Sequence, residues 1–218
     1  MTIKVDLHVH TLYSPDSLIT PQQLVYYARK RGLDGVAVTD HDRIDGALKI
    51  ARETDFFVIP GVEVSSLNGH IVALNVRELI PKGLGADETT ERIHDAGGIA
   101  VASHPANFLK ISLGKYTSRK FDAVETINAS AIPFRYSTKN SQKIASRLGL
   151  ARVGGSDAHY GPEIASAYTL VNSKVDSEKV VEAIRKGLCE PVGGAIPVMT
   201  RLRREVLILR RKFPSKAK

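Results

Sequence analysis

Short apolar runs alternate with amphipathic segments along most of this 218-residue chain. Runs such as GVAVT at 35–39 and GIAVAS at 98–103 are continuously apolar, as parallel strands covered on both faces tend to be. We expect strands at 3–10, 34–39, 56–62, 69–75, 98–103, 122–127, 151–155 and 167–171. We expect helices at 21–31, 43–54, 87–96, 137–148 and 176–187. The alternation predicts an α/β fold, either a barrel or an open doubly wound sheet.

Two segments depart from this alternation. Segment 63–76 holds two β-like pieces joined by Ser66-Leu-Asn-Gly69, which predicts a β-hairpin. The last segment has apolar residues at helical spacings of 4, 4, 3 and 4, namely Val198, Leu202, Val206, Leu209 and Phe213. We therefore expect a single α/β domain over 1–196, followed by a basic amphipathic helix or tail over 197–218.

The positive charge of the chain is concentrated in this tail. The formal net charge is +8, and residues 201–218 contribute +7 of it through eight basic residues and one acidic residue, Glu205. We expect the helix to pack its apolar stripe on the domain and leave its charges in water. The alternative is that the tail binds RNA, an acidic partner or a membrane surface.

The cysteine count and the lack of long apolar stretches indicate the cellular compartment of the protein. A lone cysteine, Cys189, excludes an internal disulfide and a thiolate metal site, and it is typical of a reducing cytoplasm. No stretch approaches the roughly 20 apolar residues of a membrane span, and the first residues lack a signal-peptide pattern. The sequence predicts a cytoplasmic protein without a membrane span, and it does not indicate an oligomeric state.

Imidazoles and carboxylates gather where the expected strands end. His8 and His10 lie one residue apart on the first strand, so they project from the same face. His41, Glu63 and His104 each follow a later strand, and the carboxyl ends of parallel strands open on one face of a barrel or sheet. The candidate ligands are His8, His10, Asp16, His41, Glu63, His70, His104, Asp157 and His159.

This donor set favours zinc, manganese or iron over a structural thiolate zinc. It holds more ligands than one ion can use, so two or three sites are expected. Ions about 3.5–4 Å apart suit phosphate-ester hydrolysis because they bind both the attacking and the leaving oxygen. Taken singly, each residue could be an ordinary surface or core residue, and we keep that interpretation for His94, inside an expected helix.

At these residues the sequence resembles the PHP (polymerase and histidinol phosphatase) superfamily. The similar segments are DLHVHTLYSPD at 6–16, TDHD at 39–42, GVE at 61–63, GH at 69–70, SHP at 103–105 and GSDAH at 155–159. They occur in the family's order. The resemblance implies a distorted TIM-like (β/α)7 barrel, here with a β-hairpin insertion and a basic C-terminal helix. It also implies a di- or trinuclear metal centre at the carboxyl-terminal face of the barrel.

The resemblance also implies a distribution of ligands among the ions. The groups are His8, His10, Glu63 and Asp157 for the first ion; Glu63, as a bridge, with His104 and His70 for the second; and Asp16, His41 and His159 for the third. Asp6 and Asp40 would orient histidines. Some relatives have a histidine after the sixth strand, where this chain has Glu125-Thr-Ile-Asn128, and this leaves the occupancy of the second site open.

The function implied is hydrolysis of a phosphomonoester, a nucleotide or similar small phosphate, by a metal-bound hydroxide. Two or three divalent ions (Mn, Zn or Fe, with Mg as a further candidate) would serve as cofactors. The residues expected to act in catalysis are His8, His10, Glu63, Asp157 and His159. Arg119 and Arg135, in loops 105–121 and 129–143, would bind the substrate phosphate because a guanidinium can do so through two hydrogen bonds.

Two other functions are consistent with the sequence. One is a 5′-3′ exonuclease or oligonucleotide phosphoesterase, in which the basic tail guides a polyanion. The other is a non-catalytic RNA-binding or assembly subunit, which would not need the intact ligand set.

Overall fold

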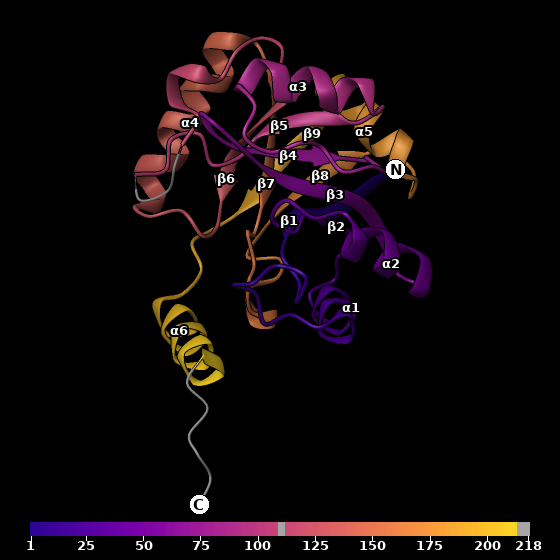
Figure 1. Ribbon diagram of the computed structural model, residues 1–218, viewed down its shortest axis with the longest axis vertical. Helices are drawn as coiled ribbons and strands as arrows, with labels where there is room; N and C mark the ends of the chain where they lie inside the picture. The colour runs from indigo at the N-terminus through magenta and orange to yellow at the C-terminus, as the bar shows by residue number, and fades with distance from the viewer. Residues whose placement is uncertain (109–111, 213–218) are drawn as a thin grey trace, which may run out of the picture.

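The structure is a computed structural model that describes residues 1–108 and 112–212. Within these residues, nine strands form one sheet in the order β7-β6-β5-β4-β3-β2-β1-β8-β9 (Figure 1). The strands are β1 (Thr2–Val9), β2 (Gly35–Val38), β3 (Phe57–Ser66), β4 (Gly69–Leu74), β5 (Ile99–Ala102), β6 (Ala123–Asn128), β7 (Ala151–Gly155), β8 (Ala167–Asn172) and β9 (Cys189–Gly193). The α-helices are α1 (Pro21–Lys30), α2 (Asp45–Glu53), α3 (Ala86–Asp95), α4 (Phe134–Leu148), α5 (Ser177–Arg185) and α6 (Val198–Lys212).

The strand directions are mixed. β1, β2 and β3 are parallel, as are β5, β6 and β7. β4 pairs antiparallel with β3 and β5, which confirms the expected hairpin, and β8 is antiparallel to both β1 and β9. Strand β9 is not among the predicted strands, because its segment Cys-Glu-Pro-Val-Gly lacks an apolar run and carries a proline, a residue confined largely to edge strands.

The sheet closes into a barrel at the end where the parallel strands finish. There the Asp157 amide donates to the His8 carbonyl (2.8 Å) and the His10 amide donates to the Ala158 carbonyl (3.0 Å), so β1 meets the segment after β7. Nearer the start of β1, β8 pairs with β1 and β9, and its Thr169 Oγ1 accepts from the Gly154 amide of β7 (2.9 Å). The fold is therefore a distorted TIM-like barrel, as expected.

Apolar packing separates a stabilising end of the barrel from a polar end. A buried cluster joins interior strand residues such as Ile3, Ile59 and Leu74 to Ile184 of α5. Arg185 of α5 also bonds to the Gly98 carbonyl (2.7 Å) where β5 begins. Because α5 closes the end at which the strands start, the opposite end is left for polar side chains. On the outside, α1 and α2 pack beside β1 and β2, and α3 and α4 beside β4 to β6.

Helix α6 differs from the expectation. Four residues of its apolar stripe are exposed: Val198 (71%), Leu202 (53%), Val206 (48%) and Leu209 (56%). Phe213 lies outside the described residues. The helix stands outside the barrel (Figure 1) and contacts it through arginines instead. The expected packing of the stripe is wrong because the facing barrel surface offers carbonyl oxygens and a buried carboxylate, which guanidinium groups satisfy better than methyl groups.

Within residues 1–108 and 112–212, no helix is both long enough and apolar enough to cross a lipid bilayer.

Gly155 allows β7 to approach β1 closely, which gives a first prediction. A Cβ at this position would lie 2.5 Å from His8 Cβ and 2.9 Å from Glu125 Oε1. We expect Gly155→Ala to lower the free energy of unfolding by about 1–3 kcal/mol, as overpacking does, measured by urea denaturation. Gly194→Ala is the control, since a Cβ there meets no described atom within 4 Å. Equal stability of the two variants would contradict this account of the approach.

Candidate metal centre

Strand β1 brings two imidazoles to one point inside the polar end of the barrel. Its register against β2 shifts between Asp6 and Val9. His8 and His10, both buried, converge so that their Nε2 atoms lie 3.1 Å apart. Two imidazole nitrogens aimed at the same small space are typical of residues that share a ligand.

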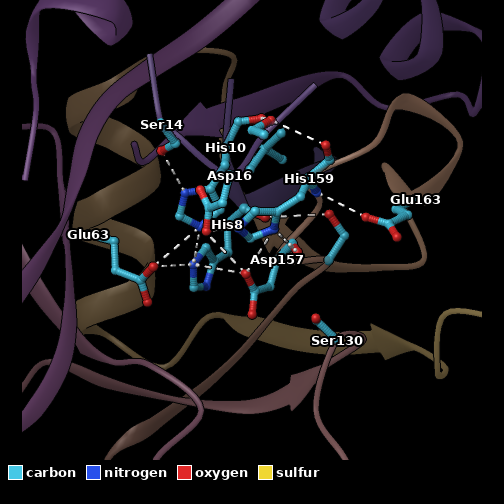
Figure 2. Close-up of polar contacts among 12 residues, drawn as sticks. His8, His10, Ser14, Asp16, Glu63, Ser130, Asp157, His159 and Glu163 are labelled. Atoms are coloured by element: carbon cyan, nitrogen blue, oxygen red, sulfur yellow. Dashed lines mark hydrogen bonds and ion pairs between the residues drawn. The ribbon is translucent and has the colours of Figure 1, made fainter. Parts of the chain in front are cut away.

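Glu63, fully buried on β3, points its carboxylate at the imidazoles of His8 and His10 (Figure 2). Imidazole nitrogens lie close to both of its carboxylate oxygens. Near Oε2 are His8 Nε2 (3.3 Å), His10 Nε2 (3.3 Å) and His41 Nδ1 (3.2 Å). Near Oε1 are His70 Nδ1 (3.2 Å) and His104 Nε2 (3.1 Å). One carboxylate thus faces imidazoles contributed by β1, β4 and the ends of β2 and β5.

The surroundings of Glu63 Oε2 fit a cation. This atom is buried and, among the described residues, accepts no hydrogen bond with acceptable geometry, although three ring nitrogens are near it. A buried carboxylate oxygen without a hydrogen bond is costly unless a cation compensates for it. Three overlapping groups of donor atoms each lie within 4.8 Å: His8, His10 and Glu63; His10, His41 and His159; and His41, Glu63 and His70.

Asp157 reaches the same space from the segment after β7. Its Oδ1 lies 3.5 Å from His10 Nε2 and 3.8 Å from His8 Nε2. The Asp157 backbone has φ +53°, in the left-handed region that non-glycine residues rarely adopt, and His104 has φ +30°. Strained backbone at two candidate ligands is typical of functional sites.

A second set of candidate ligands lies toward the solvent. Asp16 Oδ2 is 3.2 Å from His159 Nε2 and 3.5 Å from His41 Nε2. The His159 ring turns its other nitrogen, Nδ1, to the Asp157 carbonyl (2.9 Å). This contact fixes the ring so that Nε2 faces Asp16 and the space beside it. We call Asp16, His41 and His159 the outer group.

Side chains behind the ligands fix the ring of His10. Ser14 Oγ donates to Asp40 Oδ1 (3.0 Å) and is therefore free to accept from His10 Nδ1 (3.2 Å). The contact turns the other ring nitrogen, Nε2, toward Glu63 and Asp157. Asp40 thus orients His10 through Ser14, and Asp6 accepts from the backbone amides of His8 (3.3 Å), Ser156 (2.9 Å) and Ala165 (2.9 Å).

Glu125 and Asn128 are site residues whose contacts the sequence analysis did not foresee. Glu125 Oε1 lies 3.0 Å from His8 Nδ1, and its Oε2 accepts from the His104 amide (2.8 Å). Asn128 Nδ2 donates both to Glu125 Oε2 (2.9 Å) and to Asp157 Oδ2 (3.2 Å). The available signal was an acidic residue within the otherwise apolar start of β6. Both side chains thus contact candidate ligands, Glu125 at His8 and Asn128 at Asp157.

Comparisons with known proteins agree with this geometry. Residues 6–114 match the PHP domain family, and residues 136–189 match the PHP-associated family. The chain belongs to the PHP family. The PHP superfamily comprises metal-dependent hydrolases, including phosphoesterases and nucleases.

The relatives of this PHP-family chain include the protein MJ1587 and a 5′-3′ exoribonuclease. The chain is 38% identical to MJ1587 of Methanocaldococcus jannaschii over 141 residues, which are 58% of this chain and 82% of that protein. It is 39% identical to a Haemophilus influenzae 5′-3′ exoribonuclease over 89 residues, which are 38% of this chain and 32% of the enzyme.

A solved structure shows the same fold. It is a two-domain Bacteroides vulgatus protein described as containing a predicted PHP-like metal-dependent phosphoesterase. The superposition has a TM-score of 0.72 at 18% identity and covers 95% of this chain and 70% of the other.

At the PHP site, neighbouring imidazoles and carboxylates shift one another's pKa values toward the charged forms. Burial alone would raise the pKa of Glu63, but the imidazoles around it, His8 above all, hold that pKa well below its ordinary value. Burial would lower the pKa of His8, yet Glu63 and Glu125 raise it well above its ordinary value. Burial would likewise raise the pKa of Asp16, but His159 and His41 hold it far below the usual range. The carboxylates therefore stay ionised and able to bind cations.

The two arginines expected to bind phosphate lie on the surface. Arg135 is exposed in the first turn of α4, which follows β6. Arg119 is exposed between Ser118 and Lys120, whose side chains bond to α3. Loop 105–121 also includes 109–111, which are outside the described residues. A role for either arginine in substrate binding stays a prediction.

The central position of Glu63 gives a second prediction. Glu63→Gln removes the negative charge that two groups of imidazoles share, so the variant should bind fewer divalent ions per chain than the wild type. Elemental analysis after dialysis against metal-buffered solution measures this. Glu53→Gln, on an exposed carboxylate of α2, is the control. Full ion content in Glu63→Gln would show that Glu63 is not a ligand.

Proposed function

We propose that this PHP-family protein is a metal-dependent phosphoesterase that hydrolyses a phosphomonoester, such as a nucleotide or another small phosphate. The observation that supports it most is Glu63, which has imidazole nitrogens within 3.3 Å of each carboxylate oxygen. An arrangement of this kind suits a carboxylate that bridges two ions.

The residues would divide among the ions as follows. The inner group is His8, His10, Glu63 and Asp157, a second group is Glu63, His70 and His104, and the third is the outer group. Nitrogen and carboxylate donors without sulfur suit Mn²⁺, Zn²⁺ or Fe²⁺. When bound, such ions neutralise charge on the phosphoryl oxygens and lower the pKa of water.

The protein's own side chains orient the imidazoles of His8 and His10 and leave a path for the substrate to the site. Glu125 and Ser14 hold the outward nitrogens of His8 and His10, so that their Nε2 atoms point into one space before any ligand arrives. Preorganisation of this kind lowers the cost of arranging charge during the reaction. The side chains of His41 and His70 are each 22% exposed, whereas Glu63 is fully buried. We infer that the substrate phosphate enters past these two imidazoles.

The buried position of the site favours a small or terminal phosphate over the interior of a polymer. Helix α6 adds a second argument, because Arg201, Arg204 and Arg211 bond to the barrel and are not available as a track for a polyanion. Similarity to the exoribonuclease makes a 5′-3′ nuclease the second candidate. The ordered donor set disfavours a non-catalytic scaffold, which would need none of it.

The test of function compares two substrate types in the presence of Mn²⁺. We expect phosphate release from a panel of nucleoside phosphates to exceed cleavage of end-labelled oligonucleotides, and a chelator to abolish both. Asp157→Ala should lower turnover by at least about 10³-fold, because it removes a charge beside His8 and His10. Asp55→Ala, at an exposed position, is the control. Cleavage of oligonucleotides alone would favour the nuclease, and wild-type turnover by Asp157→Ala would exclude the proposed site.

A variant of α6 separates small-substrate chemistry from polyanion binding. Arg203 and Arg210 are exposed residues of α6. We expect Arg203→Glu with Arg210→Glu to hydrolyse a small nucleotide within about twofold of the wild-type rate while losing any salt-sensitive RNA binding. Steady-state assays and binding at two salt concentrations measure the two effects. A large fall in small-substrate turnover with metal content intact would show that these exposed charges act in the reaction.

A further inference from the structure

Glu163 holds the backbone of the segment that carries His159. Its carboxylate is fully buried, and Oε2 accepts from the amides of both His159 (3.0 Å) and Tyr160 (3.1 Å) (Figure 2). The Glu163 amide in turn donates to the Tyr160 carbonyl (2.8 Å). This ring of hydrogen bonds sets where the His159 side chain leaves the backbone.

Arg204 of α6 supplies the charge that Glu163 requires. Its Nη1 lies 3.2 Å from Glu163 Oε1 and 3.3 Å from Oε2, and the Arg204 side chain is only 15% exposed. A buried carboxylate that loses its cation must take up a proton or turn toward water, because an uncompensated buried charge is strongly destabilising. Either change weakens the acceptor that holds the His159 and Tyr160 amides.

Two other arginines of α6 donate hydrogen bonds to backbone carbonyls of neighbouring segments. Arg211 Nη1 donates to the Ser17 carbonyl (2.8 Å), and Ser17 Oγ donates to the His10 carbonyl (2.9 Å). Arg201 donates to the carbonyls of Ala129 (2.7 Å) and Ser130 (2.9 Å), just after Asn128. The arginine face of α6 therefore contacts the segments that carry Asp16, Asn128 and His159.

We propose that Arg204 is a positioning residue for the outer group: through Glu163 it fixes His159 and so sets the affinity of that group for its divalent ion. The inference rests on the proposed function, because it assumes that Asp16, His41 and His159 bind an ion. It gives α6 a role in the site, although none of its residues belongs to the three donor groups. Partners that orient metal ligands commonly change metal affinity by about 10–100-fold.

The experiment titrates Mn²⁺ into metal-free protein by calorimetry and counts bound ions by elemental analysis. In Arg204→Met, which keeps an unbranched apolar stem, we expect the weakest ion to bind at least about tenfold less tightly, while ions of the inner group are retained. Arg204→Lys keeps the charge but not the fork of donors, so we expect an intermediate loss. Arg203→Met, at an exposed position on the same helix, should bind like the wild type.

A double variant separates positioning from simple docking of the helix. Adding Glu163→Gln to Arg204→Met leaves a carbonyl oxygen to accept from the two amides and removes the uncompensated charge. We expect it to recover at least part of the lost affinity, whereas loss of helix docking alone would not be recovered. If Arg204→Met does not fold, Arg204→Lys alone and combined with Glu163→Gln provide the same comparison.

The outcomes distinguish the two proposals. Unchanged Mn²⁺ affinity in Arg204→Met, or a loss that Glu163→Gln does not recover, would overturn the positioning role and leave the proposed function intact. A wild-type protein that binds Mn²⁺ only in the inner group would overturn the outer site in the proposed function, and the role of Arg204 with it.

Discussion

The burial of the Glu63 carboxylate is the constraint to which the rest of the polar end of the barrel responds. In the described structure, five imidazoles face its two oxygens, and no apolar substitute could satisfy the same charge. Glu125, Asn128 and the pair of Ser14 with Asp40 then hold the candidate ligands from behind. The positive φ of Asp157 is a local strain that the surrounding hydrogen bonds maintain.

The fold separates stability from chemistry along the barrel axis. The interior beneath the site is filled by residues such as Ile59, Leu74 and Ile99, and α5 closes that end. Apolar packing there stabilises the strands whose opposite ends carry the candidate ligands, so the polar site need not stabilise the fold by itself. Helix α6 adds contacts at the rim through Arg201, Arg204 and Arg211, while Leu202 and Val206 are exposed.

The features set by local periodicity could be predicted from the sequence, and those set by tertiary contact could not. Parallel strands bring their ends together, which is why His8, His41 and Asp157 could be grouped from their positions alone. The sequence of an amphipathic helix does not show which of its faces packs on the rest of the protein. The apolar stripe of α6 was therefore predicted to pack on the barrel, although it is exposed. The contact between Glu163 and Arg204 could not be predicted from the sequence either, because the two residues are 41 positions apart. The edge strand β9 depends on pairing with β8 rather than on its own composition.

The most direct test of the central claim is anomalous diffraction from crystals grown with Mn²⁺, recorded on both sides of the manganese absorption edge. If Glu63 bridges ions, anomalous peaks should lie about 2 Å from each of its carboxylate oxygens, among the imidazoles of His8, His10 and His104. Ordered Mn²⁺ that contacts other residues, with no peak at coordination distance from Glu63, would contradict the account.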